Sequence, residues 1–413
     1  MPELGYWFVV MLFMKGSLKI TSILWIDFFN ARGGLSSSAL VNILKQFADM
    51  GYKTSLITAS AEKNQWSKYK QFHTVSIPLK EFPLLLPALF DIFLFLSLPL
   101  LAVILRVDVI ITESYLPILS TFEQLLMSKF TKTKLVLDIR TTPVESSYEG
   151  LRGSLMRFWF SASILIAKKK FDGITIITPM MKEEICNNFG IDSERVGVWT
   201  SGVSETLFNP EHYVADRSRF REKLGLNGKF VIFYHGVFSH TRGLMETVDA
   251  MKILAPKYPD IIFFLLGTGP LAPKLEESTQ DMVIHKNVIV AKPVGHSAVP
   301  RFISMCDVGI IPLPDHPYWR FQSPLKLLEY LAMKKPVILT DIPAHRAIVD
   351  EAKCGVYVSS VKPTQIAEAI EYAYRNRHNL EEWGEIGIEI VRKTYTWSKV
   401  AKDLENYLNS IDN

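Results

Sequence analysis

Short apolar runs rich in branched side chains alternate with longer segments whose apolar residues recur at helical spacing. Such runs are typical of buried strands, and the segments between them are typical of amphipathic helices. Strands that alternate with helices form parallel sheets with helices on both faces. The predicted strands are 20–26, 54–58, 107–112, 134–137 and 174–178, then 230–234, 261–266, 288–290, 308–311, 336–339 and 355–358. The clearest predicted helices are 37–50, 179–189, 243–255 and 324–333.

The two series of strands are separated by segment 201–229, which is charged, contains Pro210 and Gly228, and lacks a long apolar run. Each series restarts on its own, so the sequence predicts an α/β protein of two doubly wound domains. Ligands of such sheets bind beyond the carboxyl ends of the strands. We therefore expect a cleft between the two domains.

Composition narrows the class of protein. The 413 residues are 48% hydrophobic and 21% charged, which excludes a disordered chain. The net charge is +4, and residues 1–200 carry the whole excess with 21 basic and 17 acidic side chains. An excess this small argues against nucleic-acid binding. It is compatible with a first half that rests near an anionic membrane surface.

The three cysteines, Cys186, Cys306 and Cys354, are scattered and show no metal-ligand spacing. The nine histidines form no HExxH motif. We therefore expect a reducing, cytoplasmic location and a protein without a metal. The apolar run 6–14 has no basic region before it and no small-residue cleavage site after it, so we predict no signal peptide.

Two further segments are candidates for membrane contact. Segment 84–105 carries one charge, Asp91, and is interrupted by Pro87 and Pro99. A packed or interfacial helix is favoured there over a true span, because a charge is costly in lipid. Segment 151–170 places basic residues beside large aromatics, which is typical of a helix lying on a membrane. A core helix with a basic carboxyl end is the alternative for it.

Two turns carry candidate phosphate contacts. Gly33 and Gly34 follow the first predicted strand and allow close backbone approach to a ligand before a helix. A strand-to-helix turn often needs glycine in any case. Segment 234–244 ends in Arg242 and Gly243 at a predicted helix start, and a planar guanidinium suits phosphate oxygens. A solvated turn arginine is the alternative.

Segment 319–332 is the most informative. Ser323 is a predicted N-cap and Pro324 a predicted first helical residue. Lys326 then falls in the first turn, where a cation opposes the helix dipole unless an anion binds there. Glu329 follows on the same face, and its carboxylate can accept two hydrogen bonds from a vicinal diol. One helical turn can thus bind a phosphate and a sugar, with a surface Lys–Glu pair as the alternative.

These segments resemble the group 1 (family 4) retaining glycosyltransferases, two-domain proteins of the GT-B fold. The family's nucleotide-sugar domain is similar to HGVFSHTRGL, IIFFLLGTGP and SPLKLLEYLAMKKPVILTD. Its first domain is similar to ARGGLSSSALVNILKQFADMGYKTSLIT, and the end of that domain to ITPMMKEEICNNFGI and VWTSGVSETLFNP. YTWSKVAKDLENYL resembles the helix that crosses back. The resemblance implies Rossmann-like domains at 1–202, on the acceptor side, and 203–394, for the nucleotide sugar, with a returning helix at 395–413.

The resemblance also implies site roles. Arg242 and Lys326, with the helix end at Ser323, would hold the diphosphate, and Glu329 would bind the ribose. The loop at Pro293 and Val294 would border the base. The full implied donor-binding set is Gly33, Gly34, Gly236, Arg242, Pro293, Val294, Ser323, Lys326, Leu327 and Glu329.

Two positions depart from the family pattern. Phe321 stands where the first glutamate of the E-x7-E pattern would fall, so the usual donor-sugar contact lacks its partner. Val237 replaces an arginine of the HG-type loop, which removes one diphosphate cation, and Lys326 can compensate.

In the first domain, Asp138 and Arg140 end a strand and are expected to face the cleft. Asp138 would position an acceptor hydroxyl and Arg140 would meet an anionic group, with a strand-end salt bridge as the alternative.

The implied activity is metal-independent transfer of a hexosyl group, with retention, from a nucleotide diphosphate sugar to an acceptor hydroxyl. The predicted catalytic residues are Arg242, Lys326 and Asp138, with no metal and no cofactor besides the co-substrate. The acceptor would be a saccharide or lipid-linked, in cell-envelope glycan or glycolipid synthesis, and the protein cytoplasmic or peripheral on the inner membrane face. Two alternatives are a nucleotide-sugar 2-epimerase of the same fold and a non-catalytic binding subunit. Phe321 counts against the first, and the changes at Val237 and Phe321 would suit the second.

Overall fold

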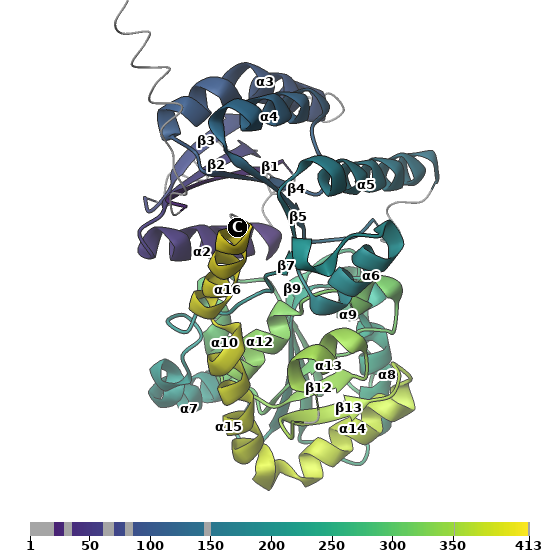
Figure 1. Cartoon of the computed structure of the whole chain (residues 1–413). Coiled ribbons are helices and arrows are strands. Elements are labelled where there is room, and N and C mark those ends of the chain that lie inside the picture. The colour runs from purple at the N-terminus through teal and green to yellow at the C-terminus, as the bar shows by residue number, and fades with distance from the viewer. Residues whose placement is uncertain are drawn as a thin grey trace, which may run out of the picture. The chain divides into compact units, whose positions relative to one another are not determined.

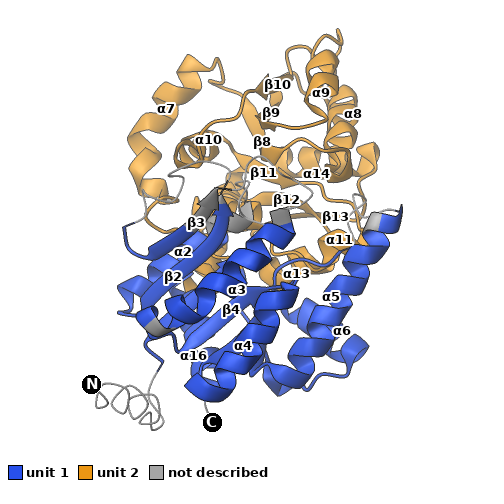
Figure 2. Cartoon of the chain, turned by 90° about the horizontal axis from the view of Figure 1, so that it is seen from above, with its two compact units in different colours: residues 1–200, 397–413 blue, residues 201–396 orange. Residues whose placement is uncertain are grey.

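The structure is a computed structural model that describes residues 20–28, 35–60, 70–78, 86–143, 150–350 and 352–411. Gly33, Gly34 and the apolar run 6–14 lie outside the described residues. The chain divides into two compact units, unit 1 with residues 1–200 and 397–413, and unit 2 with residues 201–396 (Figure 2).

Unit 1 is built on a parallel seven-stranded sheet in the order β3-β2-β1-β4-β5-β6-β7. The strands are β1 Ser22–Asp27, β2 Lys53–Ser60, β3 His73–Pro78, β4 Val109–Glu113, β5 Lys134–Ile139, β6 Gly173–Ile176 and β7 Val196–Val198. Its helices are α2 Leu35–Asp49, α3 Leu86–Leu105, α4 Ile118–Thr131, α5 Gly150–Lys170, α6 Pro179–Phe189 and α16 Trp397–Ser410. Figure 1 shows α3 and α4 on one face of the sheet, and α2 and α16 on the other. Right-handed crossovers account for the positions of α2, α3 and α4, because the chain runs one way along the sheet from β1 to β2 and the opposite way from β3 to β7.

Unit 2 is built on a parallel six-stranded sheet in the order β10-β9-β8-β11-β12-β13. The strands are β8 Phe230–Val237, β9 Ile261–Thr268, β10 Val288–Ala291, β11 Val308–Ile311, β12 Val337–Thr340 and β13 Gly355–Val358. Its helices are α7 Val214–Lys223, α8 Leu244–Leu254, α9 Ala272–Ser278, α10 Val299–Met305, α11 Pro317–Arg320, α12 Leu325–Ala332, α13 Pro343–Val349, α14 Pro363–Arg375 and α15 Leu380–Ile390. The strand order reverses beside β8, and ligands of such sheets bind at that point.

The predicted fold class, two doubly wound α/β domains, is confirmed. Each of the eleven predicted strands is present, with ends shifted by at most three residues. Two strands of unit 1, β3 and β7, were not predicted. Both lie at the edges of the sheet, and β7 has only three residues.

Segment 84–105 forms α3, which packs against α4. The Asp91 carboxylate is buried and accepts the backbone N–H groups of Leu119 (2.8 Å) and Ser120 (2.9 Å). Asp91 thus caps the amino end of α4, which has no side-chain cap of its own. Within the described residues, no helix combines the length and the apolar character needed to cross a membrane.

Helix α16 follows unit 2 in the chain but packs in unit 1, against α2 and β7. The Tyr407 hydroxyl accepts the N–H of Ile174 (2.9 Å) and donates to the carbonyl of Arg195 (2.6 Å). A Cβ at Gly197 would lie 2.4 Å from the Tyr407 ring, so β7 needs glycine there. The last helix therefore completes unit 1.

Candidate functional site

The site in unit 2 begins at the carboxyl end of β8, where the chain reads His235-Gly236-Val237. Gly236 has φ +121°, a backbone conformation that favours glycine. A Cβ at Gly236 would lie 2.6 Å from Cε and 3.1 Å from Nζ of Lys326. The missing side chain thus lets the lysine of α12 lie directly against the end of β8. The structure brings these two predicted donor-site residues together.

Helix α12 begins at Leu325, and the predicted N-cap at Ser323 is wrong. Pro324 occupies the N-cap position with ψ 92°, an extended conformation, so the helix starts later than predicted. The Ser323 hydroxyl instead accepts the N–H of Ser201 at 3.2 Å. Lys326 remains in the first turn. Leu327, predicted to line the donor site, is fully buried in the apolar core and has a packing role.

Lys326 is 9% exposed. Burial is the main cause that lowers its pKa, to about 7, and the charge of Arg242 lowers it further against the opposing effect of Glu329. The ammonium lies 5.6 Å from the centroid of the Tyr234 ring. Two cations held close together away from water are unfavourable, so this cluster is suited to receive an anion.

Arg242 ends the 3₁₀ turn His240–Arg242, and its guanidinium lies over the Trp319 ring, 4.7 Å from the centroid. The indole is fixed in turn, because Trp319 Nε1 donates to the carbonyl of Thr241 at 3.1 Å. Among the described residues, Nε of Arg242 is buried without a hydrogen-bond partner. Gly243 has φ +64°, and a Cβ there would lie 2.0 Å from the carbonyl oxygen of Pro312. The turn therefore fixes the position of Arg242, and the Nε–H of its guanidinium can donate a hydrogen bond to a ligand.

Glu329 is 5% exposed and lies between two histidines that the sequence did not mark as its partners. Its Oε1 is 2.9 Å from Nε2 of His296, and its Oε2 is 3.3 Å from Nε2 of His235. Burial lowers the pKa of His235 to about 4, so this imidazole is neutral near pH 7. The hydrogen bond to Glu329 raises the pKa of His296. Pro293 and Val294 are exposed on the loop that leads from β10 to His296.

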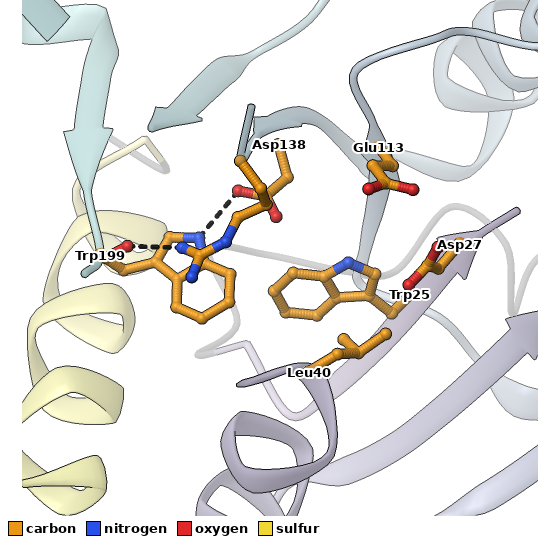
Figure 3. Close-up of a pocket in the computed structure, with 7 residues that line it drawn as sticks. Trp25, Asp27, Leu40, Glu113, Asp138 and Trp199 are labelled. Carbon is orange, nitrogen blue, oxygen red and sulfur yellow. Dashed lines mark hydrogen bonds between the residues drawn. The ribbon is translucent and has the colours of Figure 1, made fainter. Parts of the chain in front are cut away.

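The residues predicted on the acceptor side lie in unit 1, in a pocket shown in Figure 3. Its lining is Trp25, Asp27, Leu40, Glu113, Asp138, Arg140 and Trp199. Asp138 Oδ1 accepts from Thr175 Oγ1 (2.7 Å) and from Trp199 Nε1 (2.8 Å), and burial raises the pKa of this carboxyl. Arg140 stacks 3.6 Å from the centroid of the Trp199 ring and donates to the carbonyl of that residue at 2.7 Å. The pocket thus offers Arg140 and the carboxyl group of Asp138, both in contact with Trp199.

Comparison with known proteins decides the family. The model for glycosyl transferases group 1 matches residues 216–390, and the model for glycosyltransferase family 4 matches residues 33–207. The chain belongs to the group 1 glycosyltransferases. A curated relative of this glycosyltransferase is the putative teichuronic acid biosynthesis glycosyltransferase TuaH of Bacillus subtilis, 26% identical over 272 residues. The match covers 65% of this chain and 64% of TuaH, which is less than two thirds of that relative.

Solved structures agree on the architecture of the glycosyltransferase. A glycosyltransferase from Rickettsia africae superposes with a TM-score of 0.74 and 16% identity, over 94% of this chain and 98% of that chain. Anabaena HepE, solved in complex with UDP, superposes with a TM-score of 0.72 and 15% identity, over 94% and 100%. The predicted GT-B fold class is confirmed.

Proposed function

We propose that this glycosyltransferase moves a hexosyl group from a nucleotide diphosphate sugar to an acceptor hydroxyl, with retention and without a metal. The observation that carries the proposal is Lys326, which lies against Gly236 at the end of β8 and interacts electrostatically with both Arg242 and Glu329. These three charged side chains combine two cations for a diphosphate with a carboxylate for a diol. HepE, a protein of the same fold, is solved in complex with UDP and in complex with UDP-glucose, which supports the proposal.

The two cations account for leaving-group stabilisation. As the bond between the sugar C1 and the diphosphate oxygen breaks, negative charge grows on the diphosphate. Arg242, Lys326 and the first N–H groups of α12 are fixed before the reaction, and fixed donors stabilise charge that develops in a transition state. The acceptor oxygen bonds to C1 on the face that the leaving group vacates, and its proton passes to the departing diphosphate. We propose no protein nucleophile.

Glu329 is proposed to bind the nucleotide ribose. Its Oε1 now accepts from His296, which is about half exposed and can be displaced by a ribose hydroxyl. His235 is buried beside Oε2, with its Nε2 at 3.3 Å. Displacement of His296 would open Oε1 to a hydroxyl of the ribose.

In unit 1, we propose that Asp138 positions the acceptor hydroxyl. Both hydrogen bonds to its carboxylate end on Oδ1, which leaves Oδ2 for a hydroxyl in the pocket of Figure 3. TuaH is named for teichuronic acid biosynthesis, which supports an acceptor in cell-envelope glycan or glycolipid synthesis. We propose that this acceptor is reached from the cytoplasmic side of a membrane.

Product analysis tests the proposal. A thermal-shift screen of nucleoside diphosphates first selects the base, because a ligand that binds only the folded state stabilises it. Sugars on that nucleotide are then incubated with saccharide and lipid-linked acceptors, with and without a chelator. We expect a product with the donor's anomeric configuration, formed at the same rate with and without the chelator. Epimerised donor without transfer, or binding without turnover, would contradict the proposal and indicate one of the two alternatives.

A further inference from the structure

The helices on one face of unit 1 expose an unusual amount of apolar surface. Of the 24 exposed large apolar side chains among the described residues, sixteen lie on α3, α4 and α5. Those of unit 2 are few and spread over the unit. Scattered apolar side chains need no explanation, but a contiguous apolar patch marks a surface that binds something.

On each helix these side chains form a stripe. The α3 stripe is Ile92, Leu96, Leu100 and Ile104. The α4 stripe is Ile118, Phe122, Leu126 and Phe130. Residues four apart lie on the same side of a helix, so both stripes run along the helix axis. On α5, Leu151, Leu155 and Phe158 continue the pattern.

The three stripes lie in one layer. Crossovers in a constant direction from β3 to β6 place α3, α4 and α5 on the same face of the sheet, as Figure 1 shows for α3 and α4. Asp91 fixes α3 to α4 through the amino end of α4. The next helix of that layer, α6, is described in full and has no exposed large apolar side chain. The patch therefore has a boundary, and we call α3, α4 and α5 the apolar face.

The exposed charges within or just after the helices of the apolar face are mostly basic, with Asp172 after α5 as an exposed acid. Exposed basic residues stand within or just after the helices: Arg106, Lys129, Lys132, Arg157, Lys169 and Lys170. The only acids in the three helices are Asp91, which is buried, and Glu123, which is partly buried. Burial raises the pKa of Glu123 to about 7, which reduces its negative charge near neutral pH.

We propose that the apolar face binds the surface of an anionic lipid bilayer, with the stripes of α3, α4 and α5 inserted among the lipids and the basic residues at the headgroups. Apolar insertion and attraction to anionic lipid act together in such helices. A second copy of this chain fits less well, because a two-fold contact would set the same cations against each other. This surface extends the proposed membrane location, but its test needs neither donor nor acceptor. A failed transfer assay and a failed binding assay can therefore be told apart.

Flotation of the full chain with vesicles tests the proposal. Vesicles of phosphatidylcholine with phosphatidylglycerol should float the protein at low salt, and pure phosphatidylcholine should float much less. Leu96→Glu and Phe122→Glu, at side chains 74% and 68% exposed, should each lower the partition coefficient by about tenfold or more, since each places a charge where an apolar group was inserted. Lys129→Glu should remove part of the dependence on anionic lipid. The matched control is Met282→Glu in unit 2, at a side chain 82% exposed, which should float like the wild type.

Each other outcome overturns the proposal. Equal flotation of the wild type and the stripe variants would exclude the apolar face, provided their melting temperatures agree. Flotation that survives alkaline carbonate would exclude surface binding. A wild-type dimer that does not float, and that Leu96→Glu converts to a monomer, would show that a second copy covers the face.

Discussion

The buried ammonium of Lys326 couples nucleotide binding to pH. Its pKa of about 7 should rise when a diphosphate binds beside it, so binding takes up a proton. Above pH 7 the affinity should therefore fall, by up to about tenfold per pH unit. Calorimetry with the preferred nucleoside diphosphate between neutral and alkaline pH measures the slope. Lys326→Arg keeps its charge and should flatten the curve. The same slope in both proteins would show that another group titrates.

Removing either cation should impair turnover. Arg242→Ala and Lys326→Ala each delete a charge-assisted contact worth roughly 1.5–3 kcal/mol, so kcat/KM should fall by about tenfold or more. Arg301→Ala is the control, because that guanidinium also stacks on a ring, Phe220, at 4.6 Å but stands outside the site. Steady-state kinetics compares the three variants. Wild-type rates in both site variants would rule out the donor-site assignment.

Substitutions at Glu329 and at His296 should affect nucleotide binding differently. Glu329→Gln should raise KM more than it lowers kcat, because ribose is bound equally in ground and transition states. His296→Ala frees Oε1 for the ribose, so nucleotide affinity should not weaken. Steady-state kinetics measures KM and kcat of Glu329→Gln, and titration with the nucleoside diphosphate measures the affinity of both variants. Weaker binding in His296→Ala would mean that the histidine itself contacts the nucleotide.

At the scale of elements, the end of β8 should tolerate no side chain at Gly236. Gly236→Ala would force Lys326 away, since the new Cβ lies 2.6 Å from Cε. Gly225→Ala is the matched control, with φ +68° and nothing within 4 Å of the added Cβ. Both should lose about 1 kcal/mol of stability from a left-handed alanine. Only Gly236→Ala should lose nucleotide affinity as well, and equal affinities measured by thermal shift would count against the contact.

The helices and strands show which features of the structure can be predicted from the sequence alone. Strands such as β8 and β9 are predictable because their apolar runs are buried on both faces. The strand β7 was missed because three residues carry little pattern, and its position depends on α16. In the site, Lys326 and Glu329 could be placed on one helical turn from their spacing. The contacts of Glu329 with His235 and His296 could not, because three different segments meet there.

At the scale of the whole molecule, α16 should stabilise unit 1 although it follows unit 2. Tyr407→Ala removes a ring packed on Gly197 and two backbone contacts, so the free energy of unfolding should fall by about 2–4 kcal/mol. Tyr407→Phe should cost only about 1–2 kcal/mol, the part due to the hydroxyl. Urea denaturation measures both. The control is Tyr372→Ala, at an exposed ring stacked on Trp383. An equally large loss of unfolding free energy in this control would contradict a special contribution of α16 to stability.

The place of α16 in the chain also sets the order in which the two units can complete their folding on the ribosome. Unit 2 is one continuous segment, so it leaves the exit tunnel whole while unit 1 still waits for its last helix. This reverses the common sequence of co-translational folding, in which the amino-terminal domain is completed first. The apolar stripes of α3, α4 and α5 are synthesised early, so they are present on an unfinished domain throughout the translation of unit 2. We therefore expect such a nascent chain to bind a chaperone or the lipid bilayer before its synthesis ends.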